Sequence, residues 1–130
     1  MTGLLLDTHA LIWWVSDSPT LSLTARTSIE QAPEVFVSAV NVWEIAIKRS
    51  LGKLHLHVTQ EDLARIAPTF GFTELPVTAR HAAAVENLPW HHADPFDRLL
   101  VAQAQLEGAT LVTADTVLAA YGVAILSATA

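Results

Sequence analysis

Four acidic residues occupy positions from which their carboxylates can act together, and two of them follow strand-like segments. Asp7 comes directly after the apolar run Leu4–Leu6, and Asp115 comes directly after the run Leu111–Ala114. In open parallel sheets, ligands bind beyond the carboxyl ends of the strands. We therefore expect both carboxylates to emerge at the same edge of a sheet. Each aspartate also begins a helix, so N-capping explains either one taken alone.

Glu44 lies on the apolar face of a predicted helix over residues 39–49. Spacings of three and four residues place it on the same face as Val40, Ile47 and Leu51. An unpaired charge on such a face is costly. Two explanations stay open at this point. Glu44 is a functional carboxylate, or it has a structural place at the edge of the apolar stripe or in an ion pair with Arg26 or Arg98.

The segment Asp94–Asp97 has the pattern of a helix start, with Asp94 as the N-cap, Pro95 at the first position and Asp97 at the third. The exposed N–H groups and the helix dipole explain both acids structurally. As a group, however, carboxylates supply the oxygen ligands that Mg²⁺ and Mn²⁺ prefer. The candidate metal ligands and catalytic residues are therefore Asp7, Glu44, Asp97 and Asp115.

Composition narrows the class of protein that carries these acids. The chain has 130 residues, of which 52% are hydrophobic and 15% charged, so we expect one globular domain over residues 1–130. Its apolar runs are shorter than the ~18 residues of a membrane span, and no basic segment precedes the first leucines. We expect no signal peptide, no membrane contact and a cytoplasmic location. With no cysteines, the chain has neither disulfides nor thiolate metal sites.

The net charge of −6 argues against a surface that wraps nucleic acid by bulk electrostatics. The one visible basic cluster consists of Lys48, Arg49 and Lys53. Bound metal ions reverse the local sign of charge, so an acidic nuclease remains consistent with this composition. A basic partner is equally consistent with it.

Short strand-type runs alternate with helix-type runs along the whole chain, which predicts an α/β fold. We expect a central parallel sheet of about four to five strands with helices on both faces. The predicted strands cover residues 3–6, 35–37, 72–75, 110–113 and 123–126. The predicted helices cover residues 10–15, ended by Pro19, then 22–31, 39–49, 59–70, 78–86 and 95–107, with a short helix after Asp115.

Four segments together resemble the PIN-domain family, in particular the VapC-type toxins of bacterial toxin–antitoxin pairs. The segments are Leu4–His9, Ser38–Ile45, His92–Arg98 and Leu111–Asp115, and the resemblance covers nearly the whole chain. It implies a PIN-like ribonuclease that hydrolyses RNA phosphodiester bonds with water activated by one or two Mg²⁺ or Mn²⁺ ions. It also implies that the four acids form the site, that Thr113 is a hydrogen-bonding partner near it, and that Asp94 caps the helix or adds a ligand. A cognate antitoxin and a homodimer are implied in the same way.

Other functions lack the residues that they require. The chain has neither G-x-x-x-x-G-K-[ST] nor G-x-G-x-x-G, and Asp7 is not followed by the second aspartate of a haloacid-dehalogenase-like phosphatase. A zinc site formed by His91, His92 and Asp94 has no distant ligand pair to complete it. The alternative that remains is a PIN-like protein–protein interaction module without nuclease activity. Such a module would use exposed tryptophans as anchors, whereas we expect most of the four, Trp13, Trp14, Trp43 and Trp90, to lie in the core.

Overall fold

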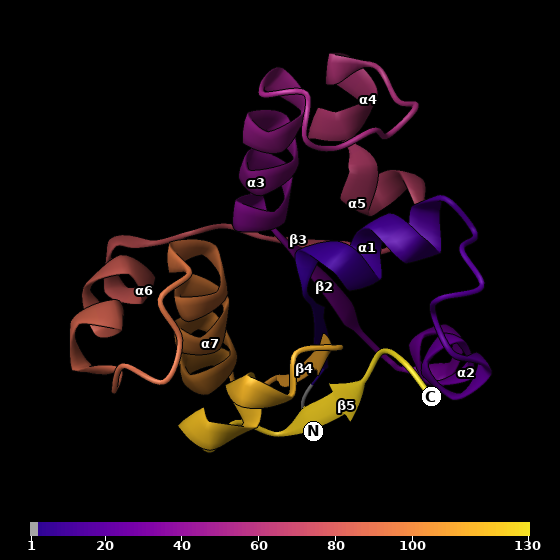
Figure 1. The fold of residues 1–130 in the computed structure, drawn as a ribbon. Helices are drawn as coiled ribbons and strands as arrows, with labels where there is room; N and C mark the ends of the chain where they lie inside the picture. The colour runs from indigo at the N-terminus through magenta and orange to yellow at the C-terminus, as the bar shows by residue number, and fades with distance from the viewer. Residues whose placement is uncertain (1–2) are drawn as a thin grey trace.

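A five-stranded parallel sheet in the order β3-β2-β1-β4-β5 forms the centre of the computed structural model, which describes residues 3–130 (Figure 1). The strands are β1 Leu4–Leu6, β2 Val35–Ser38, β3 Thr73–Leu75, β4 Thr110–Thr113 and β5 Ile125–Ser127. Leu5 of β1 pairs with Phe36 on one side and Leu111 on the other, so the first strand lies in the middle. The predicted parallel sheet is confirmed, although its last strand begins two residues later than expected.

Helices cover both faces of this sheet, as the alternation of runs predicts. They are α1 Thr8–Val15, α2 Leu23–Gln31, α3 Ala39–Ser50, α4 Gln60–Ala64, α5 Ile66–Thr69, α6 Ala79–Ala84 and α7 Pro95–Glu107, with 3₁₀ turns η1 Val85–Asn87 and η2 Thr116–Tyr121. Helices α1 and α2 lie on one side, and α6 and α7 on the other (Figure 1). Side chains alternate between the faces of a strand. Accordingly, Leu6 and Val112 belong to one apolar cluster, and Leu5 and Leu111 to the other.

Two helix boundaries differ from the prediction. The helix expected over residues 59–70 is two short helices that meet at Arg65, where φ is −112°. Pro68 explains this break, because proline has no N–H to donate to the carbonyl of Ala64 and its ring crowds that carbonyl. Helix α1 begins at Thr8, two residues before the expected start, and ends at Val15 as expected, where its cap Ser16 donates its N–H to the carbonyl of Ile12.

The expectation that most of the tryptophans lie in the core is wrong. Trp43 is 57% exposed and Trp90 is 79% exposed, while Trp13 and Trp14 are partly buried. Trp13 and Trp14 pack against one apolar cluster from its edge. The exposed rings instead pack at the surface: Trp43 lies edge-on to Phe96, with centroids 5.2 Å apart. None of the helices within residues 3–130 is long and apolar enough to cross a membrane.

Candidate metal centre

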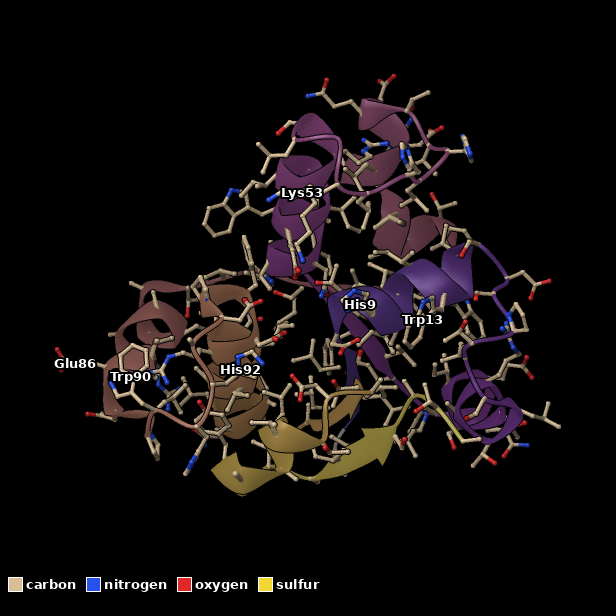
Figure 2. The ribbon with its side chains drawn as sticks, viewed as in Figure 1. His9, Trp13, Lys53, Glu86, Trp90 and His92 are labelled. Carbon is tan, nitrogen blue, oxygen red and sulfur yellow. The ribbon has the colours of Figure 1, made fainter. Side chains whose placement is uncertain are left out.

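The carboxyl ends of β1 and β4 open into a pocket between α1, α3 and α7. Its lining residues come from the ends of these strands, from the starts of α1 and α7, and from one face of α3. They are Asp7, Thr8, His9, Glu44, Lys48, Asp94, Asp97, Ala114 and Asp115. Figure 2 shows His9 on α1 and His92 beside α7 in this part of the molecule. The fold therefore brings all four acids singled out in the sequence into one place, together with Asp94.

Asp7 is both a helix cap and a wall of this pocket. Its Oδ1 accepts the backbone N–H of Ala10 at 2.8 Å, as an N-cap does. Burial raises the pKa of the Asp7 carboxyl, and hydrogen bonds from Thr113 and Ala10 partly oppose that shift. Thr113 is buried at the end of β4. Capping therefore accounts for one oxygen of Asp7 and leaves the carboxylate within the pocket.

Glu44 is 3% exposed, in keeping with its place on the apolar face of α3. Its Oε1 accepts the Thr8 hydroxyl at 2.6 Å, and its Oε2 pairs with Lys48 Nζ at 2.5 Å. The same Thr8 hydroxyl accepts a hydrogen bond from the Asn41 amide at 3.1 Å. Each carboxylate oxygen of Glu44 thus has a partner, and the buried charge is compensated.

The ion-pair partners proposed from the sequence, Arg26 and Arg98, are wrong. Arg26 pairs with Asp17 at 3.2 Å, and Arg98 donates to backbone carbonyls that include Pro89. The actual partner is Lys48, which follows Glu44 by one helical turn and therefore lies on the same face. That spacing was the available signal in the sequence.

Asp94 and Asp97, at the start of α7, have different roles. Asp94 Oδ1 accepts the N–H groups of Phe96 at 2.8 Å and Asp97 at 3.3 Å, so it is the N-cap. The side chain of Asp97 takes no part in the cap. Burial, together with the smaller effects of the negative charges of Asp94 and Asp7, raises the pKa of Asp97 to about 7.

Asp115 meets a residue that sequence reasoning did not place in the acidic site. Its Oδ1 accepts the N–H of Val117 at 3.0 Å, which caps η2, and its Oδ2 lies 2.8 Å from His92 Nε2. The same nitrogen lies 3.4 Å from Asp97 Oδ2. The sequence places His92 five residues before Asp97, within the segment His92–Arg98, but its pattern there suggested only a zinc site.

The zinc combination of His91, His92 and Asp94 does not come together. The ring of His91 packs edge-on against Tyr121, with centroids 5.0 Å apart, and the Asp94 carboxylate is engaged as a cap. Within residues 3–130, the group whose potential ligand atoms lie within 4.8 Å of one another is instead His92, Asp97 and Asp115.

The donor set of the pocket fits a divalent cation. Five carboxylates line it, and the one lysine among the lining residues is committed to Glu44. Burial and neighbouring negative charges raise the pKa of Asp97, and a bound cation would lower it again by stabilising the ionised carboxylate. Carboxylate oxygens without thiolates favour hard ions such as Mg²⁺ or Mn²⁺.

Known proteins match this chain over most of its length. Residues 4–124 match the family described as PIN domain. The chain is 34% identical over 119 residues to ribonuclease VapC22 of Mycobacterium tuberculosis, covering 88% of each chain. Its fold is similar to that in DNA-bound VapBC from Salmonella typhimurium, with 16% identity, 98% coverage of each chain and a TM-score of 0.69. A toxin–antitoxin complex from Klebsiella pneumoniae matches with 23% identity, 86% coverage of each chain and a TM-score of 0.58.

Proposed function

The chain belongs to the PIN domain family, and from this premise we propose that it is a divalent-metal-dependent endoribonuclease that acts as the toxin of a toxin–antitoxin pair. The observation that carries the proposal is the convergence of Asp7, Glu44, Asp97 and Asp115 on one pocket. The similarity to a protein named as a ribonuclease, over 88% of both chains, supports RNA as the substrate. We treat residues 1–130 as one nuclease domain.

We propose that the four carboxylates form the metal centre, with Mg²⁺ or Mn²⁺ as the ion. When bound, a divalent ion supplies activation of water and neutralisation of charge on the phosphate. Thr113 supports the site by its hydrogen bond to Asp7, and Asp94 supports it by capping the helix that carries Asp97. Both residues act on the carboxylates rather than on the substrate.

Two further lining residues, Thr8 and Lys48, hold Glu44 in place, and Lys48 adds positive charge to the pocket. Thr8 fixes one oxygen of Glu44, while Lys48 neutralises the other from the partly exposed side of α3. The ammonium group of Lys48 therefore provides positive charge at the pocket, where RNA phosphates must approach five carboxylates. An excess of negative charge without a bound cation would repel the same phosphates.

We propose a cognate antitoxin, a homodimer and a cytoplasmic location as the setting of this activity. The similarity to chains of VapBC and of a toxin–antitoxin complex supports the first of these. The net charge of −6 and the acidic pocket suit a basic antitoxin segment that covers the site. The exposed rings of Trp43 and Trp90 offer apolar anchors for a partner.

The test is RNA cleavage by the purified chain without its partner. We expect cleavage with Mg²⁺ or Mn²⁺, none with excess EDTA, and loss of activity in Asp7→Asn and Asp97→Asn with folding retained. Asp17→Asn is the matched control, because the Asp17 side chain is 91% exposed and lies outside the pocket. Metal-independent cleavage, or full activity in both pocket variants, contradicts the proposal. Antitoxin binding without any cleavage would instead favour an interaction module.

A further inference from the structure

His92 places an imidazole against two acids of the pocket, Asp97 and Asp115, where carboxylates are expected to share a cation. Its Nε2 lies 2.8 Å from Asp115 Oδ2 and 3.4 Å from Asp97 Oδ2. In nucleases with two metal ions, the ions lie about 3.5–4 Å apart and are held by neighbouring carboxylates. The ring nitrogen therefore competes for the oxygens that would hold one of two such ions.

The hydrogen bond on the other side of the ring decides what Nε2 does. The backbone N–H of Asp94 donates to His92 Nδ1 at 3.0 Å, so Nδ1 presents its lone pair to that donor. A neutral imidazole carries its proton on one nitrogen only, and here that nitrogen must be Nε2. Nε2 therefore donates to Asp115 and has no lone pair to offer a metal ion. This geometry makes His92 a hydrogen-bond donor to the acids, not a ligand.

The two acids near His92 differ in how fully they are engaged. Asp115 uses Oδ1 to accept from Val117 and Oδ2 to accept from His92. The contact of 3.4 Å to Asp97 is longer than the 2.7–3.2 Å of an N–H···O hydrogen bond. Asp97 thus remains available for a cation shared with Asp7, which lines the same pocket.

The backbone of His92 is anchored, which keeps the ring in this position. Its N–H donates to the Tyr121 hydroxyl at 2.9 Å, and the same hydroxyl accepts from the guanidinium of Arg98 at 3.3 Å. Arg98 is buried in the first turn of α7, one residue after Asp97. The imidazole is therefore held from both its backbone and its Nδ1 side.

We propose that the Nε2–H of His92 occupies the place between Asp97 and Asp115 that a second divalent ion would take, so that this chain binds a single ion on the side of Asp7 and Asp97. The inference rests on the proposed metal centre and specifies its occupancy. Within the centre of four carboxylates, Asp115 then acts through its hydrogen bond with His92, while the ion lies on the side of Asp7 and Asp97.

Counting Mn²⁺ ions bound to the full chain tests this directly. Calorimetric titration, together with the EPR signal of free Mn²⁺, is expected to give one ion per wild-type chain. In His92→Ala the donor is absent, and we expect a second ion with the spin-coupled EPR spectrum of a Mn²⁺ pair. His92→Gln, which keeps an N–H donor near the position of Nε2, is expected to return the count to one. His91→Ala is the matched control and is expected to bind one ion.

Pulsed EPR on the Mn²⁺-loaded protein separates a donor from a ligand. If His92 is only a hydrogen-bond donor, we expect no nitrogen coupling from its ring, so the nitrogen couplings of the wild type and His92→Ala should be the same. A nitrogen coupling that is present in the wild type and absent from His92→Ala is the contrary result. Such a coupling would identify His92 as a ligand and overturn the inference. Two ions in the wild type, or one ion in both the wild type and His92→Ala, would overturn it as well. If His92→Ala does not fold, the wild-type count and spectrum decide the question alone.

Failure of this inference can be told apart from failure of the proposed function. If the wild type cleaves RNA but binds two ions, the occupancy is wrong and the nuclease assignment stands. If it binds one ion and cleaves no RNA under any condition, the nuclease assignment fails while the role of His92 stands.

Discussion

The hydroxyl of Thr8, in the first turn of α1, donates to Oε1 of Glu44 in α3 across 2.6 Å. This contact joins residues 36 positions apart in the chain and is wholly buried. It links the end of β1, where Asp7 lies, to the helix that carries Glu44. The acidic pocket is therefore held by hydrogen bonds between its walls as well as by apolar contacts.

Replacing Thr8 tests this link. In Thr8→Val, the Glu44 oxygen and the Asn41 amide each lose a buried partner, and an unsatisfied buried group costs about 1–3 kcal/mol. We expect urea denaturation to show a loss of stability in that range, whereas Thr8→Ser keeps the hydroxyl and most of the stability. Thr116→Val, at an exposed position, is the control. Equal stability of Thr8→Val and wild type would show that the link contributes nothing.

The Glu44–Lys48 pair is expected to be coupled both to folding and to the cation. Lys48→Met leaves the buried carboxylate of Glu44 without its counter-charge, and we expect a loss of about 2 kcal/mol, because Lys48 is partly exposed. The double variant Glu44→Gln/Lys48→Met removes both charges and is expected to recover part of that loss. A cycle of the four proteins measures the coupling, and strictly additive effects contradict it.

The same substitution has a second, separable consequence for metal binding. The ammonium group of Lys48 lies beside the Glu44 carboxylate. The hydrogen bond to that carboxylate is the main cause of the raised pKa of Lys48. Removing this competing cation should tighten Mg²⁺ binding in Lys48→Met. The increase in Tm with added Mg²⁺ is therefore expected to be larger than in wild type. A smaller increase would place Lys48 among the groups that favour the ion.

The raised pKa of Asp97 predicts how stability depends on pH. Between pH 4 and pH 7, folded Asp97 keeps a proton that the unfolded chain releases, because its pKa is about 7 rather than the usual 3.8. The folded state then binds more protons, so the metal-free protein loses stability as pH rises through this window. One pKa unit corresponds to about 1.4 kcal/mol. Thermal unfolding in EDTA should show this decline, and Asp97→Asn should flatten it.

Added Mg²⁺ should reverse that dependence. A divalent ion binds the ionised carboxylates, so it stabilises the folded protein more at pH 8 than at pH 5. Comparing the Tm shift at the two pH values provides the measurement. A shift of equal size at both would mean that the ion does not compete with the proton on Asp97.

Arg98 is expected to support the segment that carries His92. The guanidinium is buried and donates to the carbonyls of Pro89 and Leu88 at 2.8 and 3.2 Å, and it lies 3.8 Å from the centroid of the Trp90 ring. Lysine keeps the charge but lacks the planar fork. We expect Arg98→Lys to cost on the order of 2–3 kcal/mol and to change the fluorescence of Trp90.

Arg80→Lys is the control for that experiment, because Arg80 is exposed at the start of α6. It should leave both stability and Trp90 fluorescence unchanged. If Arg98→Lys behaves like this control, the segment before α7 is held by its other contacts, such as the hydrogen bond from His92 to Tyr121.

The sequence alone determined the parallel sheet, the helices on both faces and the positions of the acids at the ends of elements. These features are local: apolar runs specify strands, and Asp7, Asp94 and Asp115 are N-caps whose partners lie two or three residues away. Their common location followed from the rule that parallel strands present their carboxyl ends at one edge of the sheet. The bend at Arg65 was also present in the sequence, through Pro68, but was missed.

The tertiary structure decided which side chains meet across that edge. The contacts of Glu44 with Thr8 and of His92 with Asp115 join residues 36 and 23 positions apart, and such partners depend on how helices pack rather than on local propensity. Likewise, only the fold shows that Trp43 and Trp90 remain at the surface, where Trp43 packs on Phe96 and Trp90 on Arg98. The types and positions of the acids came from the sequence, whereas the packing of α1, α3 and α7 determined their partners and their protonation.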